Sequence, residues 1–133
     1  MIDKMIMQGR LLLFDKLNID GSIVSKDCKL KIPEKVPCVI DFNFIEPSYI
    51  LGFAKVGTDK EGLIVEINVT NMTRGSQMFN LFNELHESLG LGGYYSNVKR
   101  DGKLVTSMEL KGVSITFWPV RSEYRINSIS TRR

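Results

Sequence analysis

The chain has 133 residues, of which 43 % are hydrophobic and 25 % charged, and its net charge is only +3. This length and apolar content predict one globular domain that buries roughly two-thirds of its unfolded surface, and they exclude a disordered chain. Apolar runs stay far below the roughly 20 residues that span a bilayer, and polar residues within the first 14 argue against a signal peptide.

Four segments in the first half of the chain are rich in apolar residues and are predicted as β-strands: 5–14, 38–44, 49–56 and 62–70. The first is interrupted by Gly9, and the Asp20-Gly21 pair that follows it is a strong turn signal. In the second and fourth segments apolar and polar residues alternate, which is typical of strands with one buried face.

One helix is predicted in the middle of the chain, over about residues 76–89. Its apolar side chains recur at helical spacing and form a single stripe: Met78, Phe82, Leu85 and Leu89. Ser76 or Thr73 is expected to cap its first turn, and Gly90 is expected to end it.

Further strands are predicted after this helix. A Gly-Gly-Tyr-Tyr strand at 92–95 precedes a hairpin turn at Asp101-Gly102. Strands at 104–110 and 113–117 follow before a proline. Together the elements predict an α+β fold, either a small β-barrel or a rolled, mostly antiparallel sheet of six or seven strands around one main helix.

A single domain is predicted over residues 1–126, with a basic C-terminal tail at 127–133. The segment from 121 onward holds four arginines and one glutamate, and this excess equals the net charge of the whole chain. These arginines are the candidate partner-binding residues: Arg121, Arg125, Arg132 and Arg133. They indicate either a solvated terminus or an electrostatic contact with an acidic protein surface or nucleic acid.

Residue types that carry catalysis or bind metals are sparse. His86 is the only histidine and lies on the predicted helix, where the adjacent Glu87 does not face it. Cys28 and Cys38 lack the further ligands of a zinc site and indicate free thiols in a reducing compartment. The sequence therefore predicts no catalytic residue, no metal and no cofactor.

Glycines and aromatic residues in the second half suggest two further patterns. Gly90, Gly92 and Gly93 follow the predicted helix rather than precede one, so they are expected to admit a closely packed strand rather than to cradle phosphate. The aromatic residues either belong to the core or form a stacking platform for single-stranded nucleic acid: Tyr94, Tyr95, Trp118 and Tyr124.

Four short segments occur in an informative order along the chain. They read FDKLNIDGSI at 14–23, ILGFAKV at 50–56, GLIV at 62–65 and LKGVSITFWPV at 110–120. This order resembles that of the tailed-phage prohead maturation proteases, a family whose fold is shared with herpesvirus assemblins. The resemblance extends from about residue 9 to residue 126 and implies the fold of that family.

The resemblance also implies a serine nucleophile, a histidine and an acidic residue, and the chain lacks each at the matching position. Val39–Phe44 contains no histidine, Gly90 stands at the serine position, and Gly112 stands where an acidic residue is common. His86 and Ser88 lie on the predicted helix rather than on the strands that the site requires. We therefore expect a protease fold without protease activity.

By this resemblance we expect an auxiliary or decoration protein of a tailed-phage capsid, made in the host cytoplasm and located in the virion. It would bind and stabilise the shell of the major capsid protein, with its basic tail against packaged DNA or an acidic protein surface. No membrane and no small-molecule substrate are expected. Two alternatives are an active maturation protease with a rearranged site and an unrelated module that binds nucleic acid or protein.

Overall fold

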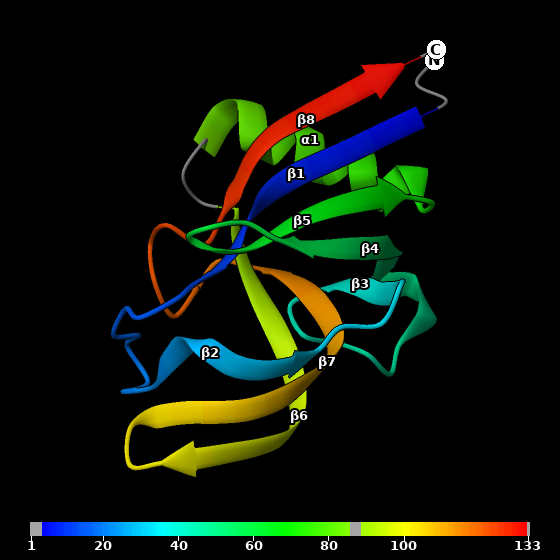
Figure 1. Ribbon diagram of the computed structural model, residues 1–133. Coiled ribbons are helices and arrows are strands. Elements are labelled where there is room, and N and C mark those ends of the chain that lie inside the picture. The colour runs from blue at the N-terminus through cyan, green and yellow to red at the C-terminus, as the bar shows by residue number, and fades with distance from the viewer. Residues whose placement is uncertain (1–3, 86–88, 133) are drawn as a thin grey trace.

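The computed structural model describes residues 4–85 and 89–132, which form one α-helix and eight strands (Figure 1). The predicted α+β class is confirmed. The strands are β1 (Lys4–Leu13), β2 (Ile23–Lys31), β3 (Val36–Ile40), β4 (Ile50–Thr58), β5 (Gly62–Val69), β6 (Gly90–Asp101), β7 (Leu104–Thr116) and β8 (Ile126–Arg132). The helix α1 (Met72–Leu85) lies between β5 and β6 in the chain, and a short 3-10 helix (Pro47–Tyr49) precedes β4.

The strands belong to one mixed sheet that is not closed. Strands β3, β4, β5, β1 and β8 pair in that order, and all of these pairs are antiparallel. One edge of β7 pairs in parallel with β2 and, further along, with β3, while its other edge pairs antiparallel with β6. Strand β7 therefore joins the two parts of the sheet.

The start of β6 lies against the segment that precedes β8. The amide of Leu91 donates to the carbonyl of Tyr124 (2.8 Å), and the amide of Ile126 donates to the carbonyl of Leu89 (2.9 Å). These hydrogen bonds connect the β6–β7 hairpin to the part of the sheet that contains β1 and β8. The two parts together surround a common interior.

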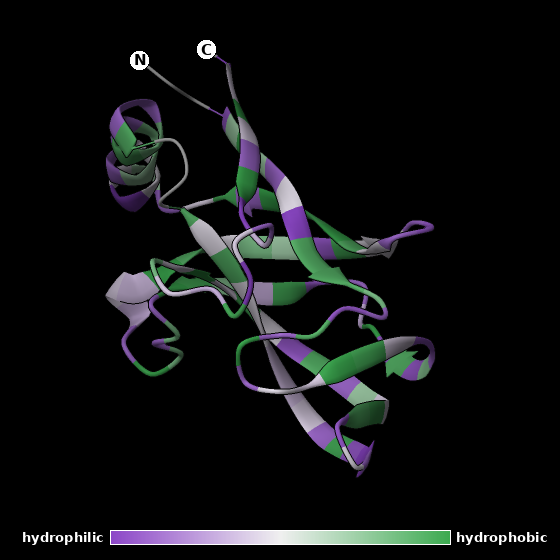
Figure 2. Ribbon diagram, turned by 90° about the vertical axis from the view of Figure 1, so that its left-hand side faces the viewer, coloured by the Kyte–Doolittle hydropathy of each residue, from purple (hydrophilic) through white to green (hydrophobic). Residues whose placement is uncertain are grey.

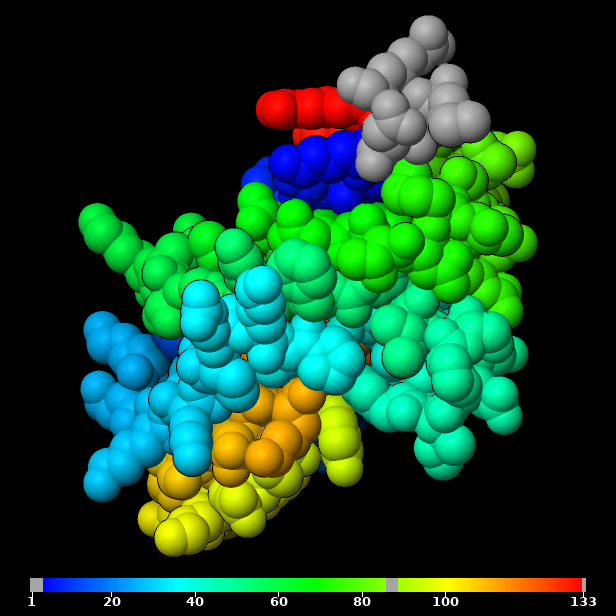
Figure 3. Space-filling model, turned by 90° about the vertical axis from the view of Figure 1, so that its right-hand side faces the viewer, coloured from blue at the N-terminus to red at the C-terminus, as the bar shows by residue number. Residues whose placement is uncertain are grey.

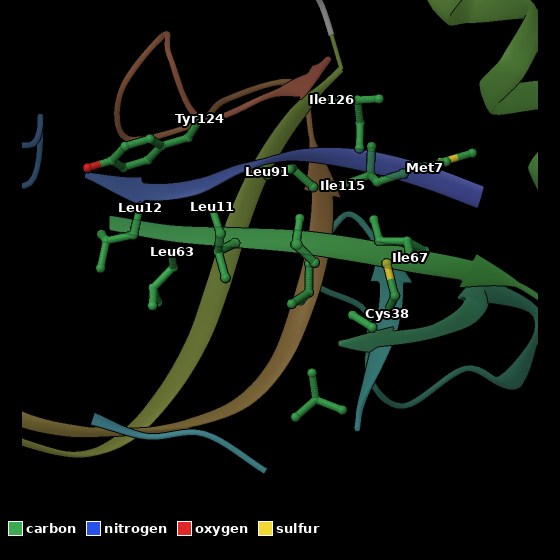
Figure 4. Close-up of a cluster of buried hydrophobic side chains, with 14 of the residues drawn as sticks. Met7, Leu11, Leu12, Cys38, Leu63, Ile67, Leu91, Ile115, Tyr124 and Ile126 are labelled. Carbon is green, nitrogen blue, oxygen red and sulfur yellow. The ribbon is translucent and has the colours of Figure 1, made fainter. Parts of the chain in front are cut away.

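Apolar side chains from both parts of the sheet fill this interior. Apolar and polar residues alternate along several strands (Figure 2), as expected where one face of a strand is buried. Fully buried side chains from six strands point toward one another (Figure 4): Met7, Leu11, Cys38, Leu63, Ile67, Leu91, Ile115 and Ile126. Burial of each large side chain stabilises the fold by roughly 1.5–3 kcal/mol.

Helix α1 packs closely on β1 and β5. A Cβ atom at Gly75 would lie 2.6 Å from Val69 Cγ1 and 3.3 Å from Met5 Sδ, so only glycine allows this approach. Met78, one turn later, is also buried. Neither α1 nor the short 3-10 helix, within the residues described, has the length and apolar content needed to cross a membrane.

The boundaries of α1 differ from the prediction. The helix begins at Met72 because the side chain of Asn71, rather than Ser76 or Thr73, accepts the amide of Arg74 (3.2 Å). Its described part ends at Leu85, and Gly90, which was expected to end the helix, is the first residue of β6.

The strand boundaries differ as well, so the described residues contain eight strands instead of six or seven. Strands β2 and β8 were not predicted, and the two strands predicted over 104–117 form the single strand β7. The strand predicted over 38–44 ends at Ile40, because Asp41 and Phe42 adopt left-handed φ angles of 58° and 55°.

The segment predicted as a basic tail contains most of β8. Residues 126–132 pair with β1, and Arg132 lies opposite Lys4 in the register. The predicted boundary at residue 126 therefore falls at the first residue of a strand within the sheet. Arg133 lies outside the described residues.

Candidate functional site

The three segments that the resemblance assigns to catalysis lie side by side. Ser114 on β7 is opposite Val39 of β3 on one edge and opposite Gly92 of β6 on the other. Beyond β3 the chain bends back, and the amide of Phe42 donates to Ser114 Oγ (2.7 Å). Segments distant in the sequence thus converge on the C-terminal half of β7.

Aromatic rings occupy this point of convergence. A Cβ atom at Gly92 would collide with the ring of Phe42, and one at Gly112 would collide with the ring of Phe44. The ring of Phe44 also packs against Tyr94, with a centroid distance of 5.2 Å. Gly92 and Gly112 therefore provide flat backbone on which rings lie. Of the glycines expected to admit a closely packed strand, Gly92 lies under a ring instead, and a Cβ atom at Gly90 would lie 2.7 Å from the carbonyl oxygen of Thr116 on β7.

The hydroxyl of Ser114 serves the fold. Ser114 is completely buried, and its Oγ accepts the amide of Phe42 and donates to the carbonyl of Ile115 (3.1 Å). The hydrogen bond from the amide of Phe42 stabilises the left-handed turn after β3. The two side chains considered in the sequence as substitutes for the catalytic residues, His86 and Ser88, lie outside the described residues.

An apolar cavity of about 180 Å³ lies next to these rings. Its wall is formed by the end of β1, the turn that follows it, the β6–β7 hairpin and the loop after β7. Most of its lining side chains are apolar or aromatic, among them Leu11, Leu12, Val24, Tyr95, Val105, Met108 and Tyr124.

Polar groups on one side of the cavity form a small network. Tyr124 Oη donates to Asn18 Oδ1 (2.7 Å), and Asn18 Nδ2 donates to Ser22 Oγ (3.2 Å). Both the amide and the hydroxyl of Ser22 donate to Asp20 Oδ1 (3.0 and 2.6 Å). Burial raises the pKa of Asp20, but the hydrogen bonds from Ser22 outweigh it and leave this pKa below its ordinary value. Asp20 is therefore a carboxylate at neutral pH.

Tyr95 contributes a polar group without a partner. Its Oη is buried and forms no hydrogen bond with any described residue. Burial raises the pKa of Tyr95 well above its ordinary value, so the hydroxyl stays protonated. A buried hydroxyl without a partner costs roughly 1–3 kcal/mol, and the hydroxyl of Tyr95 packs against the backbone of Gly93.

The mouth of the cavity is rimmed by exposed apolar side chains. Trp118 is 84 % exposed and Phe42 is 44 % exposed, and Val98 and Val120 complete the rim. The segment between β3 and β4 that carries Phe42 stands out from the body of the molecule (Figure 3, teal). Exposed aromatic side chains around an apolar cavity are typical of a binding site.

The candidate arginines do not gather into one patch. The guanidinium of Arg121 donates to the carbonyl of Leu17 (2.9 Å) and forms an ion pair with Glu123 (2.9 Å). The backbone of Arg125 bridges to Gly90. The extended strand β8 then separates Arg125 from Arg132 by roughly 20 Å. Arg133 is outside the described residues.

The aromatic residues considered as a stacking platform are also separated. Tyr124 is 1 % exposed and is hydrogen-bonded inside the cavity wall, whereas Tyr94 and Trp118 are exposed. Tyr95 lies in the cavity wall. The four rings therefore do not form one exposed surface, and the core interpretation holds for Tyr124.

Groups that could bind a metal are dispersed in the described part of the chain, which contains no cluster of three histidine, cysteine or acidic residues. Cys28 and Cys38 are free. Cys38 is buried, and burial raises the pKa of its thiol to about 12.

A groove lined by lysine side chains was not predicted from the sequence. The parallel pairing of β2 with β7 places Lys29 and Lys31 beside Lys99 of β6 along one groove. The carboxylate of Glu109 lies in the same groove, where hydrogen bonds from Lys111 and Asn97 lower its pKa. These residues are about 70 positions apart in the sequence, and only the pairing of the strands brings them together.

No model of a known protein family matches the chain, and the search of curated proteins gives no match. The aromatic-rimmed cavity and the order of the sequence segments are therefore the grounds for a functional proposal.

Proposed function

We propose that the protein is a catalytically inactive auxiliary protein of a tailed-phage capsid, which binds the major capsid protein and stabilises the shell. The finer fold assignment, a rolled sheet of the prohead-protease type, is part of this proposal. One observation carries it. Where the three segments converge, the chain presents glycines, aromatic rings and the mouth of an apolar cavity, with Trp118 and Phe42 exposed beside it.

These exposed rings favour attachment to a protein. Burial of apolar surface stabilises a complex by roughly 25 cal/mol per Å², and tryptophan is among the residues that contribute most at interfaces. Trp118 is nearly as exposed in the free protein as in an unfolded chain. A partner that covers the cavity mouth would therefore remove its ring, and that of Phe42, from water.

Copy number in particles tests the proposal. We expect quantitative mass spectrometry of purified mature virions to find full-length protein at a fixed ratio to the major capsid protein. Absence from the particles would overturn the proposal. Recovery of only a trace of self-cleaved fragments would overturn it too, and would favour an active protease with a rearranged site.

Substitution at the rim tests the mode of attachment. Trp118→Ala is expected to lower the affinity for purified capsid shells at least tenfold, as measured by co-sedimentation. Ile64→Ala is the matched control, because Ile64 is an exposed apolar residue on β5 outside the cavity wall (42 % exposed). Equal binding by both variants would exclude the cavity mouth as the attachment site.

A second candidate function, the binding of packaged DNA or another polyanion, is favoured by the basic groove. Lys29, Lys31 and Lys99 line it together. Contacts with phosphates release counterions, so this function predicts an affinity that falls steeply with salt and is lost when the three lysines are replaced by glutamine. Binding that is insensitive to these substitutions would exclude the groove.

A further inference from the structure

We propose that the cavity is a binding site for a free, neutral, apolar molecule about the size of one substituted benzene ring. The inference goes beyond the proposed function, because it concerns the inside of the cavity rather than the protein surface that would cover its mouth. It follows from the depth of the cavity, its volume, the polar groups of its wall and the charges at its mouth.

The cavity reaches into the core of the protein. Apolar side chains from β1, β2 and β7 form its wall and are at most 4 % exposed: Leu11, Leu12, Val24, Val105 and Met108. An occupant in contact with these side chains is largely withdrawn from water. Burial of apolar surface stabilises such a complex by roughly 25 cal/mol per Å², so the wall favours a hydrocarbon.

Volume limits the size of the occupant. An apolar cavity of about 150 Å³ that is lined by leucine, isoleucine and phenylalanine binds benzene. The cavity of this protein encloses about 180 Å³. It therefore has room for a benzene ring with one small substituent, such as toluene.

The buried polar side chains of the wall already form hydrogen bonds within the protein. Tyr124 Oη donates to Asn18 Oδ1 (2.7 Å), and Asn18 Nδ2 donates to Ser22 Oγ (3.2 Å). Thr116 Oγ1 accepts the amide of Trp118 (3.1 Å). A polar occupant would lose its hydrogen bonds to water and find few partners here, so the wall selects against it.

The hydroxyl of Tyr95 does not change this selection. It is buried and packs against the backbone of Gly93, so an occupant meets the ring of Tyr95 and not its hydroxyl. Water gains equally little from the site, because a buried water molecule normally makes about three hydrogen bonds.

Charges of opposite sign lie together at the mouth. Asp20 and Arg100 both line the cavity and are exposed. Burial raises the pKa of Asp20, and hydrogen bonds from Ser22 and the nearby positive charge of Arg100 lower it. A carboxylate disfavours an anion and a guanidinium disfavours a cation, so neither kind of ion gains from this pair. A neutral occupant is therefore favoured.

The rim favours a free molecule over a side chain of another polypeptide. Phe42, Val98, Trp118 and Val120 surround the mouth, and each is at least 36 % exposed. A phenylalanine side chain that entered here would bring its own peptide groups against this apolar rim, where they lose water without gaining a partner. A free hydrocarbon carries no such groups.

Binding of three probes of similar shape to the isolated protein tests the inference. We expect toluene to bind, with NMR shifts centred on the methyl groups of Leu11, Val105 and Met108. Benzoate and benzylammonium are expected to bind at least tenfold more weakly, as measured by isothermal titration. Absence of toluene binding, or tighter binding of either ion, would overturn the inference.

Thermal unfolding provides a measurement that needs no variant. A ligand that binds only the folded state raises the melting temperature as its concentration increases. Toluene is expected to do so, whereas benzoate and N-acetyl-phenylalanine amide at the same concentrations are not. Stabilisation by the amide equal to that by toluene would overturn the assignment to a free molecule.

Filling the cavity locates the site. Val105→Phe adds a ring to the buried wall and is expected to weaken toluene binding at least tenfold. Ile64→Phe is the matched control, because it adds a ring to the exposed surface of β5 outside the cavity wall. Unchanged binding by a folded Val105→Phe variant, or an equal loss in both variants, contradicts the proposed location.

The probe series on the wild type decides the question if Val105→Phe does not fold. None of these measurements needs a capsid. Failure of the hydrocarbon site is therefore distinguishable from failure of capsid attachment, which is measured in virions.

Discussion

Two regions of the molecule share one interior but differ in how it is filled. In the part that contains β1, β4, β5 and α1, side chains such as Met5, Met7 and Ile67 are at most 1 % exposed. Around the β6–β7 hairpin the interior contains a cavity and a tyrosine hydroxyl that has no hydrogen-bond partner among the described residues, and aromatic side chains are exposed on the surface nearby. The cavity and the exposed aromatic side chains lie in the region that we assign to binding.

Removing a side chain from the filled region should have the largest effect on stability. Ile67→Ala is expected to lower the free energy of unfolding by about 2–5 kcal/mol, because the fully buried Ile67 leaves a void among well-packed neighbours. Urea denaturation measures the loss. Val98→Ala, at the rim of the cavity, serves as the comparison and is expected to cost far less. Similar losses in the two variants would contradict the contrast between the regions.

The hydroxyl of Tyr124, between the two regions, contributes to the stability of the fold. Tyr124→Phe removes the hydrogen bond to the buried Asn18 and is expected to lower the free energy of unfolding by about 1–3 kcal/mol. Tyr94→Phe, an exposed tyrosine, is the control for thermal and urea unfolding. A Tyr124→Phe variant as stable as the wild type would show that Asn18 finds another partner.

A surface ion pair on the filled region should contribute less. Arg10 donates to both carboxylate oxygens of Asp59 (2.8 and 2.7 Å), and these hydrogen bonds hold the pKa of Asp59 well below its usual range. The folded-state pKa is lowered, so this stabilisation is complete above the unfolded value of about 3.9 and is lost as the pH falls below it. Because Asp59 is partly exposed, we expect less than about 1 kcal/mol.

Unfolding at two pH values checks this contribution. At pH 6 Asp59→Asn should be slightly less stable than the wild type, and at pH 3 the difference should shrink. The exposed Asp27→Asn is the control. A difference that stays constant between the two pH values would mean that the charge of Asp59 has no role.

The smallest effect on stability is expected at the cavity mouth. Trp118→Ala should change the free energy of unfolding by less than about 0.5 kcal/mol, because the ring is largely in water. The same variant is expected to lose capsid binding. A large loss of stability would show that Trp118 belongs to the fold rather than to a binding surface.

The elements with the clearest local signals could be predicted from the sequence. Alternation of apolar and polar residues indicated the strand at 62–70, and the Asp101-Gly102 pair marked the β6–β7 hairpin. The two turn residues are Gly102, with a φ of 62°, and Lys103, one position later than predicted. Strands β2 and β8 were not predicted, because they are defined by pairing with distant strands, β7 and β1, rather than by a local pattern. Polar residues such as Lys29 and Ser128 dilute their pattern.

The candidate site could be anticipated only in part. Gly90, Gly92 and Gly93 were expected to admit a closely packed strand, but the group that lies on Gly92 is the ring of Phe42. The cavity was not anticipated, because its wall combines four separate stretches of chain, and no local pattern marks their meeting point. The buried hydroxyl of Tyr95 is a property of the folded state alone.

Strands β2 and β3 both pair with the same edge of β7, and this affects the order in which the chain folds. The β6–β7 hairpin has a two-residue turn and can form within microseconds, whereas β2 must wait for a partner about 80 residues further along. Loop closure over such a span is slow, and an unpaired strand is prone to join other chains in the meantime. Folding should therefore begin at the hairpin, and a weakened Asp101-Gly102 turn should show itself first as aggregation during refolding.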